Sequence, residues 1–119
     1  MCKVVGMPFV YALNLFDLAD NDDYVQYLRR TSAAVEKHGG RLTALGSLSV
    51  GAVSSGGEPR QVMVLAEWPS AEALEAFRRD PDHAEVHALR GSGTQRYLWW
   101  SYDRAEDFRE VLSTLGRLP

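Results

Sequence analysis

The sequence predicts a single α+β domain of the ferredoxin-like type over residues 1–119, with the order strand, helix, strand, strand, helix, strand and an antiparallel sheet. Two observations lead to this fold class. The length suits one hydrophobic core but not two independent ones. Segments with the two-residue period of strands also alternate with segments of helical period, in a composition that is 45% hydrophobic and 24% charged, as in ordinary globular proteins.

The first strand is predicted over residues 8–18, where apolar side chains fall on both sides of the alternation. One face would carry Phe9, Tyr11, Leu13 and Leu15, and the other Val10, Ala12, Asn14 and Phe16. Because both faces are largely apolar, we expect this strand to lie in the centre of the sheet.

The first helix is predicted to follow, with Asp20, Asn21 and Asp22 supplying capping oxygens at its start. One helical face is then formed by Tyr24, Tyr27, Leu28, Thr31, Ala34, Val35 and His38. Gly39 and Gly40 end the helix, since glycine adopts the left-handed conformation of a C-terminal cap without steric cost.

Two extended runs, residues 41–53 and 61–68, are separated by Ser, Gly and Pro residues at 54–59, which predicts a β-hairpin. Pro69 and Ser70 then begin a short helix that runs through Phe77.

The chain after that short helix is predicted to complete the fold. A break at residues 80–82 precedes a helical stretch over 86–90, and a glycine-rich loop is expected at 91–93. The last strand is predicted over 95–103, and an additional amphipathic helix within 104–119. We expect residues 1–7 to be flexible.

The βαββαβ order places both helices on one face of the sheet, so the other face is left bare. A large apolar sheet face is ordinarily covered by a second copy of the chain or by a ligand. We therefore expect a homodimer with a small-molecule pocket.

Composition and motifs narrow the class of partner. The net charge is −3 and the basic residues are scattered, which argues against nucleic-acid binding. The longest apolar runs, such as Val62 to Ala66, are too short to cross a membrane, and the first residues do not resemble a signal peptide, so we expect a cytoplasmic protein. Cys2 is the single cysteine, and no phosphate loop, nucleophile elbow or dinucleotide fingerprint is found, which disfavours kinases, α/β-type serine hydrolases, dehydrogenases and iron–sulfur proteins. We also expect no cofactor.

Several segments resemble, in order and spacing, the bacterial domain-of-unknown-function family numbered 1330 (DUF1330), which belongs to the dimeric α+β barrel superfamily. The segments are Tyr24-x-x-Tyr27, Gly39-Gly40-Arg41, Glu67-Trp68-Pro69-Ser70 and Asp80-Pro81-Asp82-His83 through Ala88-Leu89-Arg90. The resemblance covers residues 8–103 and implies a homodimer. The superfamily includes cofactor-free monooxygenases, polyketide cyclases and small isomerising or dehalogenating enzymes, so the fold alone leaves the reaction open.

Three features depart from the family pattern. The family commonly has an acidic residue where this chain has Asn14, and often a tyrosine where it has His83. The last strand and the helix after it also look more elaborate than the usual ending, which favours a specialised ligand or a larger dimer contact.

His83, His87 and Arg90 are the candidate catalytic residues. The two histidines share a helical face at a spacing used by metal ligands and acid–base pairs. The Glu of a zinc-protease helix and nearby cysteines are both missing, so we predict no metal site. One histidine could transfer a proton without a cofactor, and the alternative is a pair of solvent-facing or interface histidines.

Arg90 and Arg41 are candidates for binding a carboxylate or enolate, since a guanidinium presents paired donors to such anions. The alternative is a structural salt bridge, for example with Glu67; the two interpretations are balanced for Arg90, and the salt bridge is favoured for Arg41. Glu67 ends an otherwise apolar strand, where it either pairs with an arginine or serves as an acid–base group. Asn14 interrupts an apolar pattern, so its amide either contacts a ligand or joins a polar network, and we prefer it as a substrate-orienting residue.

Aromatic residues complete the candidate substrate-binding set, namely Tyr11, Trp68, Trp99 and Trp100. They suit a planar or polyketide-like molecule, while packing in the core or the dimer is the alternative for most of them. Trp99 and Trp100 face opposite sides of the last strand, and we prefer the one on the open face as a pocket residue.

Two candidate functions are consistent with these features of the sequence. The first is a cofactor-independent enzyme of the cyclase, isomerase or monooxygenase type that acts on an aromatic, polyketide-like or carbonyl compound by proton transfer. The second is a dimeric protein that binds or carries a small molecule without catalysis. A pocket with histidine and arginine converging would favour the enzyme, and a purely apolar pocket the carrier.

Overall fold

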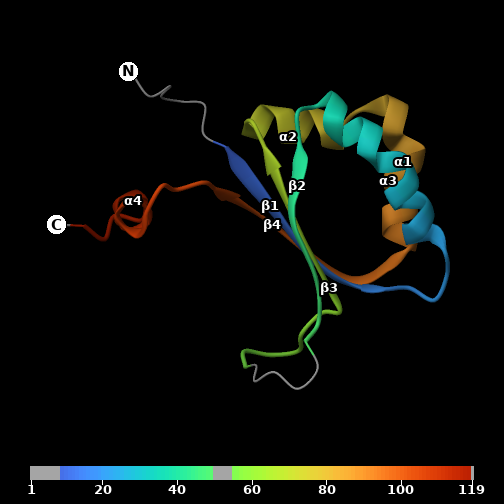
Figure 1. Cartoon of the computed structure of the whole chain (residues 1–119), viewed down its shortest axis with the longest axis horizontal. Coiled ribbons are helices and arrows are strands. Elements are labelled where there is room, and N and C mark those ends of the chain that lie inside the picture. Colours follow the sequence, from blue (N-terminus) through green and yellow to red (C-terminus); the bar gives the residue numbers. More distant parts are fainter. Residues whose placement is uncertain (1–8, 50–54, 119) are drawn as a thin grey trace.

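The computed structural model describes residues 9–49 and 55–118 (Figure 1). Its elements are β1 (Val10–Leu18), α1 (Asp23–Lys37), β2 (Arg41–Ser47), β3 (Val62–Trp68), α2 (Ala71–Arg78), the 3₁₀ turn η1 (Pro81–His83), α3 (Ala84–Ser92), β4 (Thr94–Asp103) and α4 (Phe108–Thr114). This order confirms the predicted ferredoxin-like α+β fold and the additional C-terminal helix. The expected flexibility of residues 1–7 concerns a segment outside the described residues.

The four strands form one antiparallel sheet in the order β2-β3-β1-β4, so β1 lies in the interior of the sheet as predicted. Helices α1, α2 and α3 cover one face of the sheet, and the other face is open (Figure 1). The alternation along β1 decides which side chains meet the helices: Val10, Ala12, Asn14 and Phe16 are buried, and the residues between them face the open side.

Helix α1 begins and ends where the polar and glycine residues predict. The N-cap residue is Asp22, whose side chain makes no capping hydrogen bond. The Asn21 side chain instead accepts a hydrogen bond from the backbone N–H of Asp23, the first helical residue, at 2.9 Å. Gly39 has a φ of +79°, the left-handed conformation that glycine adopts at a helix C-terminus.

Two local predictions differ from the structure. Strand β2 ends at Ser47 instead of residue 53, and residues 50–54 of the predicted hairpin lie outside the described part of the chain. Gly91 and Ser92, predicted to form a loop, belong to α3. Tertiary contacts explain the longer helix, because the Ser92 hydroxyl donates to Asp23 at 2.7 Å and the Ser92 carbonyl accepts from Asn21 at 3.1 Å.

The core on the helical side of the sheet consists of two separate clusters. One contains Val10, Ala12, Ala34, Ala66, Trp68, Leu74 and Phe77. The other contains Phe16, Tyr24, Tyr27 and Val86, with Tyr97 packed against them. Phe16 and Val10 stand six residues apart on β1, so the two clusters support the helices at opposite ends of the same strand.

We predict opposite effects for alanine at two glycines of the α3 terminus. A Cβ at Gly93 would lie closer than 3 Å to the Leu89 carbonyl oxygen and to the Tyr24 backbone, so Gly93→Ala should destabilise the fold by about 1–3 kcal/mol. A Cβ at Gly91 would meet nothing within 4 Å, and Gly91→Ala should stabilise the helix by about 0.5–1 kcal/mol. Urea unfolding measures both, and equal stability of the two variants would contradict the close α1–α3 contact.

Candidate functional site

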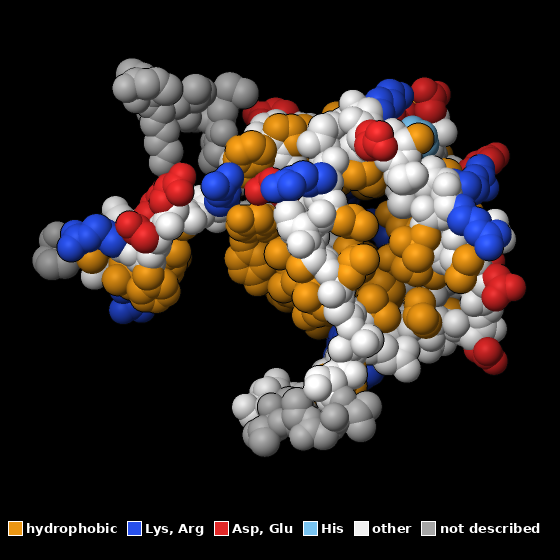
Figure 2. Space-filling view, in the orientation of Figure 1, with side chains coloured by type: hydrophobic (Ala, Val, Ile, Leu, Met, Phe, Trp, Pro, Cys, Tyr) orange, Lys and Arg blue, Asp and Glu red, His pale blue; other side chains and the backbone are white. Residues whose placement is uncertain are grey.

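A cavity of about 700 Å³ lies between α1 and the β2–β3 side of the sheet. Figure 2 shows a hollow lined by hydrophobic side chains between β2 and the helices. The volume is in the range of small-molecule sites, and most of the lining is apolar or aromatic. The cavity is therefore the candidate functional site.

The cavity exists because small side chains lie between large ones. Ala12 and Ala66 are opposite each other on β1 and β3 and form part of its floor. Leu42 and Leu45 of β2 line the cavity but are 51% and 66% exposed, so the cavity opens at this edge of the sheet.

Asn14 lies in a hydrogen-bonded network that borders the cavity. Its amide nitrogen donates to the carbonyl oxygens of Ala12 and Val64, both at 3.3 Å. Its oxygen accepts from the Tyr97 hydroxyl at 2.5 Å. Burial raises the pKa of Tyr97 to about 12, so the phenol keeps its proton at neutral pH. Asn14 thus belongs to a polar network and also lines the cavity.

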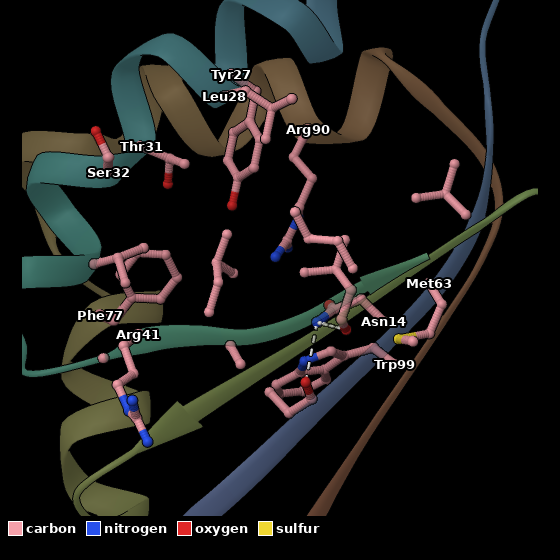
Figure 3. Close-up of a pocket in the computed structure, with 18 of the residues that line it drawn as sticks. Asn14, Tyr27, Leu28, Thr31, Ser32, Arg41, Met63, Phe77, Arg90 and Trp99 are labelled. Carbon is pink, nitrogen blue, oxygen red and sulfur yellow. Dashed lines mark hydrogen bonds between the residues drawn. The ribbon is translucent and has the colours of Figure 1, made fainter. Parts of the chain in front are cut away.

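Arg90 brings a positive charge to this polar end of the cavity. It lies in the last turn of α3 and its side chain points into the cavity, beside Tyr27 and above Asn14 (Figure 3). Its guanidinium lies 5.4 Å from the centre of the Tyr97 ring, a cation–π contact. Among the described residues it forms no salt bridge, so its charge is available to an anionic ligand.

His83 and His87 lie outside the cavity lining. The His87 Nε2 donates to the carbonyl oxygen of Phe77 at 3.1 Å, and the ring packs edge-on against the Phe77 ring. Burial lowers the pKa of His87, which favours the neutral imidazole. Of the three candidate catalytic residues, the structure therefore places only Arg90 at the cavity.

His83 instead belongs to a charged cluster around Asp80. The Asp80 carboxylate lies 2.8 Å from both Lys37 Nζ and His38 Nε2, and 3.8 Å from His83 Nε2. The hydrogen bond from Lys37, followed by that from His38, holds the pKa of Asp80 well below its ordinary value. This cluster joins the end of α1 to the turn after α2.

Glu67 and Tyr11 are neighbours on the open face of the sheet, away from the cavity. Arg41 Nε donates to Glu67 Oε1 at 3.1 Å, which confirms the salt bridge favoured for Arg41. Glu67 is also 3.9 Å from a guanidinium nitrogen of Arg104. Arg41 lies at the cavity edge with its charged group directed away from the interior (Figure 3).

The tryptophans divide between the two faces. Trp68 and Trp99 line the cavity, and Trp68 packs against Phe77 with ring centres 4.7 Å apart. Trp100 is 54% exposed and lies on the open face. The pairing of Asn14 with Trp99 puts Trp99 on the helical side, so this cavity is lined by Trp99 and not by Trp100. The preference for the open-face tryptophan as a pocket residue stays a prediction.

Several cavity residues were not singled out as site residues from the sequence, among them Tyr27, Thr31, Leu42, Leu45 and Phe77. Tyr27 and Thr31 did appear on the predicted face of α1, but helical period alone cannot separate a cavity wall from a packed core.

Two absences concern the described residues only. Within residues 9–49 and 55–118, no group of three or more His, Cys, Asp or Glu side chains is arranged to bind a metal ion. In the same ranges, no helix has the length and apolar character that crossing a membrane requires.

The family described as "Domain of unknown function (DUF1330)" matches residues 9–100, which confirms the resemblance noted in the sequence. No curated protein matches the chain. The protein of unknown function RPA0582 from Rhodopseudomonas palustris has a similar structure, with a TM-score of 0.71, 21% identity and 85% of each chain covered.

Two further solved structures share the fold at lower identity. SnoaB, a cofactor-independent oxygenase from Streptomyces nogalater, has a TM-score of 0.60 at 12% identity over 87% of this chain and 99% of its own. A dimeric ferredoxin-like protein of unknown function from Jannaschia sp. CCS1 has a TM-score of 0.60 at 13% identity over 81% and 99%. At these identities the similarity establishes the fold alone.

The Asp80 cluster predicts acid sensitivity. The folded-state pKa of Asp80 is depressed, so its stabilising contribution is complete above the ordinary value of 3.8 and is lost as the pH falls towards the folded pKa. Between about pH 5 and 2, Asp80→Asn should therefore lose less stability than the wild type. Urea unfolding across this range measures the difference.

Asp82→Asn is the matched control, because the Asp82 side chain is 76% exposed and its removal leaves the Asp80 contacts in place. It should keep the acid dependence of the wild type. An unchanged pH profile for Asp80→Asn would contradict the role of the cluster.

Proposed function

We propose that this chain, which belongs to the DUF1330 family, binds an apolar small molecule carrying an acidic oxygen and acts on it as a cofactor-independent enzyme. The acidic group is a carboxylate, enolate or phenolate. The observation that carries the proposal is Arg90, a cation that enters a mostly apolar cavity and forms no salt bridge within the described part of the chain.

The cavity supports an amphipathic ligand. An apolar body would fill the space above Ala12 and Ala66, between Tyr27 and Trp99. The acidic oxygen would pair with Arg90, whose guanidinium offers two parallel donors to such a group. A charge–charge contact in an apolar cavity is stronger than one in water, which would favour this orientation.

The enzymatic part rests on what Arg90 could do to a reacting carbonyl. Transfer of a proton from the carbon beside a carbonyl to a water molecule leaves an enolate, and a positioned guanidinium would stabilise its negative oxygen. Tyr97 keeps its proton at neutral pH and donates it in a hydrogen bond to Asn14, so it would not act as a base. SnoaB, which shares the fold, is described as a cofactor-independent oxygenase, and this supports the proposal of catalysis without a cofactor.

We also propose that the chain forms a homodimer through the open face of the sheet. Trp100 and Tyr102 are 54% and 52% exposed on that face, and apolar sheet faces are ordinarily covered in solution. The similar structure from Jannaschia sp. CCS1 is described as dimeric. The expectation of a cytoplasmic protein stays a prediction.

A non-catalytic carrier is the second candidate, and the placement of the histidines favours it. Neither His83 nor His87 lines the cavity, so no imidazole there is available as a base. In a carrier, Arg90 would contribute affinity for the acidic group without any later chemical step.

Two fluorescent probes of similar shape test the binding site. 8-Anilinonaphthalene-1-sulfonate is an apolar anion, and N-phenyl-1-naphthylamine is its uncharged counterpart. Arg90→Gln should weaken binding of the anion by about tenfold and change binding of the neutral probe by less than about twofold, since only the charged contact is lost. The exposed Arg29, outside the cavity, provides the control Arg29→Gln, which should leave both affinities unchanged. Unchanged affinity of Arg90→Gln for the anion would overturn the proposed role of Arg90.

A cavity-filling substitution and its surface control show where the probes bind. Ala66→Leu adds volume to the cavity floor and should weaken both probes by about tenfold, whereas Ala76→Leu makes the same change on an exposed position of α2 and should leave both affinities unchanged. Circular dichroism checks that Ala66→Leu remains folded. Equal affinity for both variants would place the probes outside the cavity.

The enzyme and the carrier differ in their effect on carbon–hydrogen bonds. Nuclear magnetic resonance can follow exchange of the C2 hydrogens of α-tetralone, an aromatic ketone, in deuterated water. The enzyme should accelerate this exchange, and Arg90→Gln should remove the acceleration. Binding of the ketone with no acceleration of exchange would favour the carrier.

A further inference from the structure

Helix α4 presents an apolar face that the described residues of the chain do not cover. Phe108 and Leu115 are 70% and 66% exposed, and Leu112 lies between them on the same side of the helix. Figure 1 shows α4 apart from the sheet and the other helices, and Figure 2 shows hydrophobic side chains on this separate lobe.

The ends of α4 are those of a well-formed helix. The Asp107 carboxylate accepts a hydrogen bond from the Glu110 N–H at 2.9 Å at the N-terminus, and Gly116 has a φ of +71° after the C-terminus. A helix of seven residues is nevertheless too short to be stable in water by itself, because isolated helices shorter than about 12–15 residues are marginal. The apolar face of α4 therefore needs a surface to pack against.

Arg104 directs the chain away from its own sheet. Its backbone N–H donates to the Phe9 carbonyl oxygen at 2.9 Å, and its guanidinium lies 5.3 Å from the centre of the Phe9 ring. The same side chain is 3.9 Å from Glu67. These contacts hold the end of β4 in line with the sheet, so that α4 continues outward and does not fold back over the open face.

Exposed apolar side chains lie on both the open face and α4. Trp100 and Tyr102 are exposed on the open face of β4, and α4 begins a few residues later. Four strands of seven to ten residues, at about 4.8 Å between strands and about 3.3 Å per residue, give a sheet face of roughly 500 Å². A standard stable interface buries about 800 Å² of accessible surface on each partner, and α4 would add the exposed Phe108 and Leu115 to the area that the sheet face supplies.

We infer that α4 docks on a second copy of this chain, as an arm that reaches across the dimer formed by the two open faces. This inference rests on the homodimer of the proposed function. The two-fold symmetry of such a dimer makes the contact reciprocal, with each α4 packed on the other protomer. Phe108, Leu112 and Leu115 would be buried in this contact.

A matched pair of substitutions in α4 tests the arm. Leu112→Glu places a charge on the apolar face, and Ser113→Glu adds the same charge on the opposite side of the same helix. Sedimentation equilibrium of the full chain should show a dimer dissociation constant at least about tenfold higher for Leu112→Glu and within about twofold of the wild type for Ser113→Glu. Circular dichroism and probe binding should be unchanged in both.

The outcomes separate the arm from the dimer and from the ligand site. Trp100→Glu should weaken a dimer formed through the open face. If Trp100→Glu weakens the dimer while Leu112→Glu has no effect, the dimer through the open face is supported and the docking of α4 on the partner is overturned. A tighter dimer for Leu112→Glu would also overturn the arm, because it would mean that α4 had covered its own open face. A monomeric wild type that still binds 8-anilinonaphthalene-1-sulfonate through Arg90 would overturn the dimer and the arm together but leave the ligand site intact.

Discussion

The distribution of large and small side chains on the helical face of the sheet is the constraint on which the cavity depends. At one end of β1, Phe16 is stacked on Tyr97 with ring centres 5.0 Å apart, and Tyr24 packs against Phe16 at 4.8 Å. At the other end, Trp68 and Phe77 fill the layer between sheet and helices. The helices rest on these two aromatic clusters, and the small side chains between them cannot fill the space beneath α1.

The same arrangement of side chains also determines where a charged side chain, Arg90, enters the cavity. Arg90 can project into the cavity because α3 packs against α1 and ends beside the Phe16–Tyr97 cluster, with the Tyr97 ring beneath the guanidinium. Asn14 accepts the hydrogen bond of the Tyr97 hydroxyl, so one end of the cavity is polar and the remainder is mostly apolar. An asymmetric cavity of this kind selects both the shape and the orientation of a ligand.

Sequence patterns located the secondary structure well where periodicity and capping residues agree. The central position of β1 followed from its two apolar faces, and the end of α1 followed from Gly39. The sequence patterns gave the wrong assignment at Gly91 and Ser92, which local propensity places in a loop. There, hydrogen bonds that join Ser92 to Asn21 and Asp23 extend the helix, and residue propensities carry no information about such distant partners.

By itself the sequence determined the fold class, the element order and the resemblance to the DUF1330 family, because each depends on local periodicity and on short ordered segments. Only the tertiary structure decided which candidates share a site. The strand register placed Trp99 beside Asn14 and sent Trp100 to the open face, and helix packing brought Arg90 to the cavity while His87 turned to the Phe77 carbonyl. Spacing along one helix fixes which residues share a face, but what that face meets is set by strand register and by packing between distant segments.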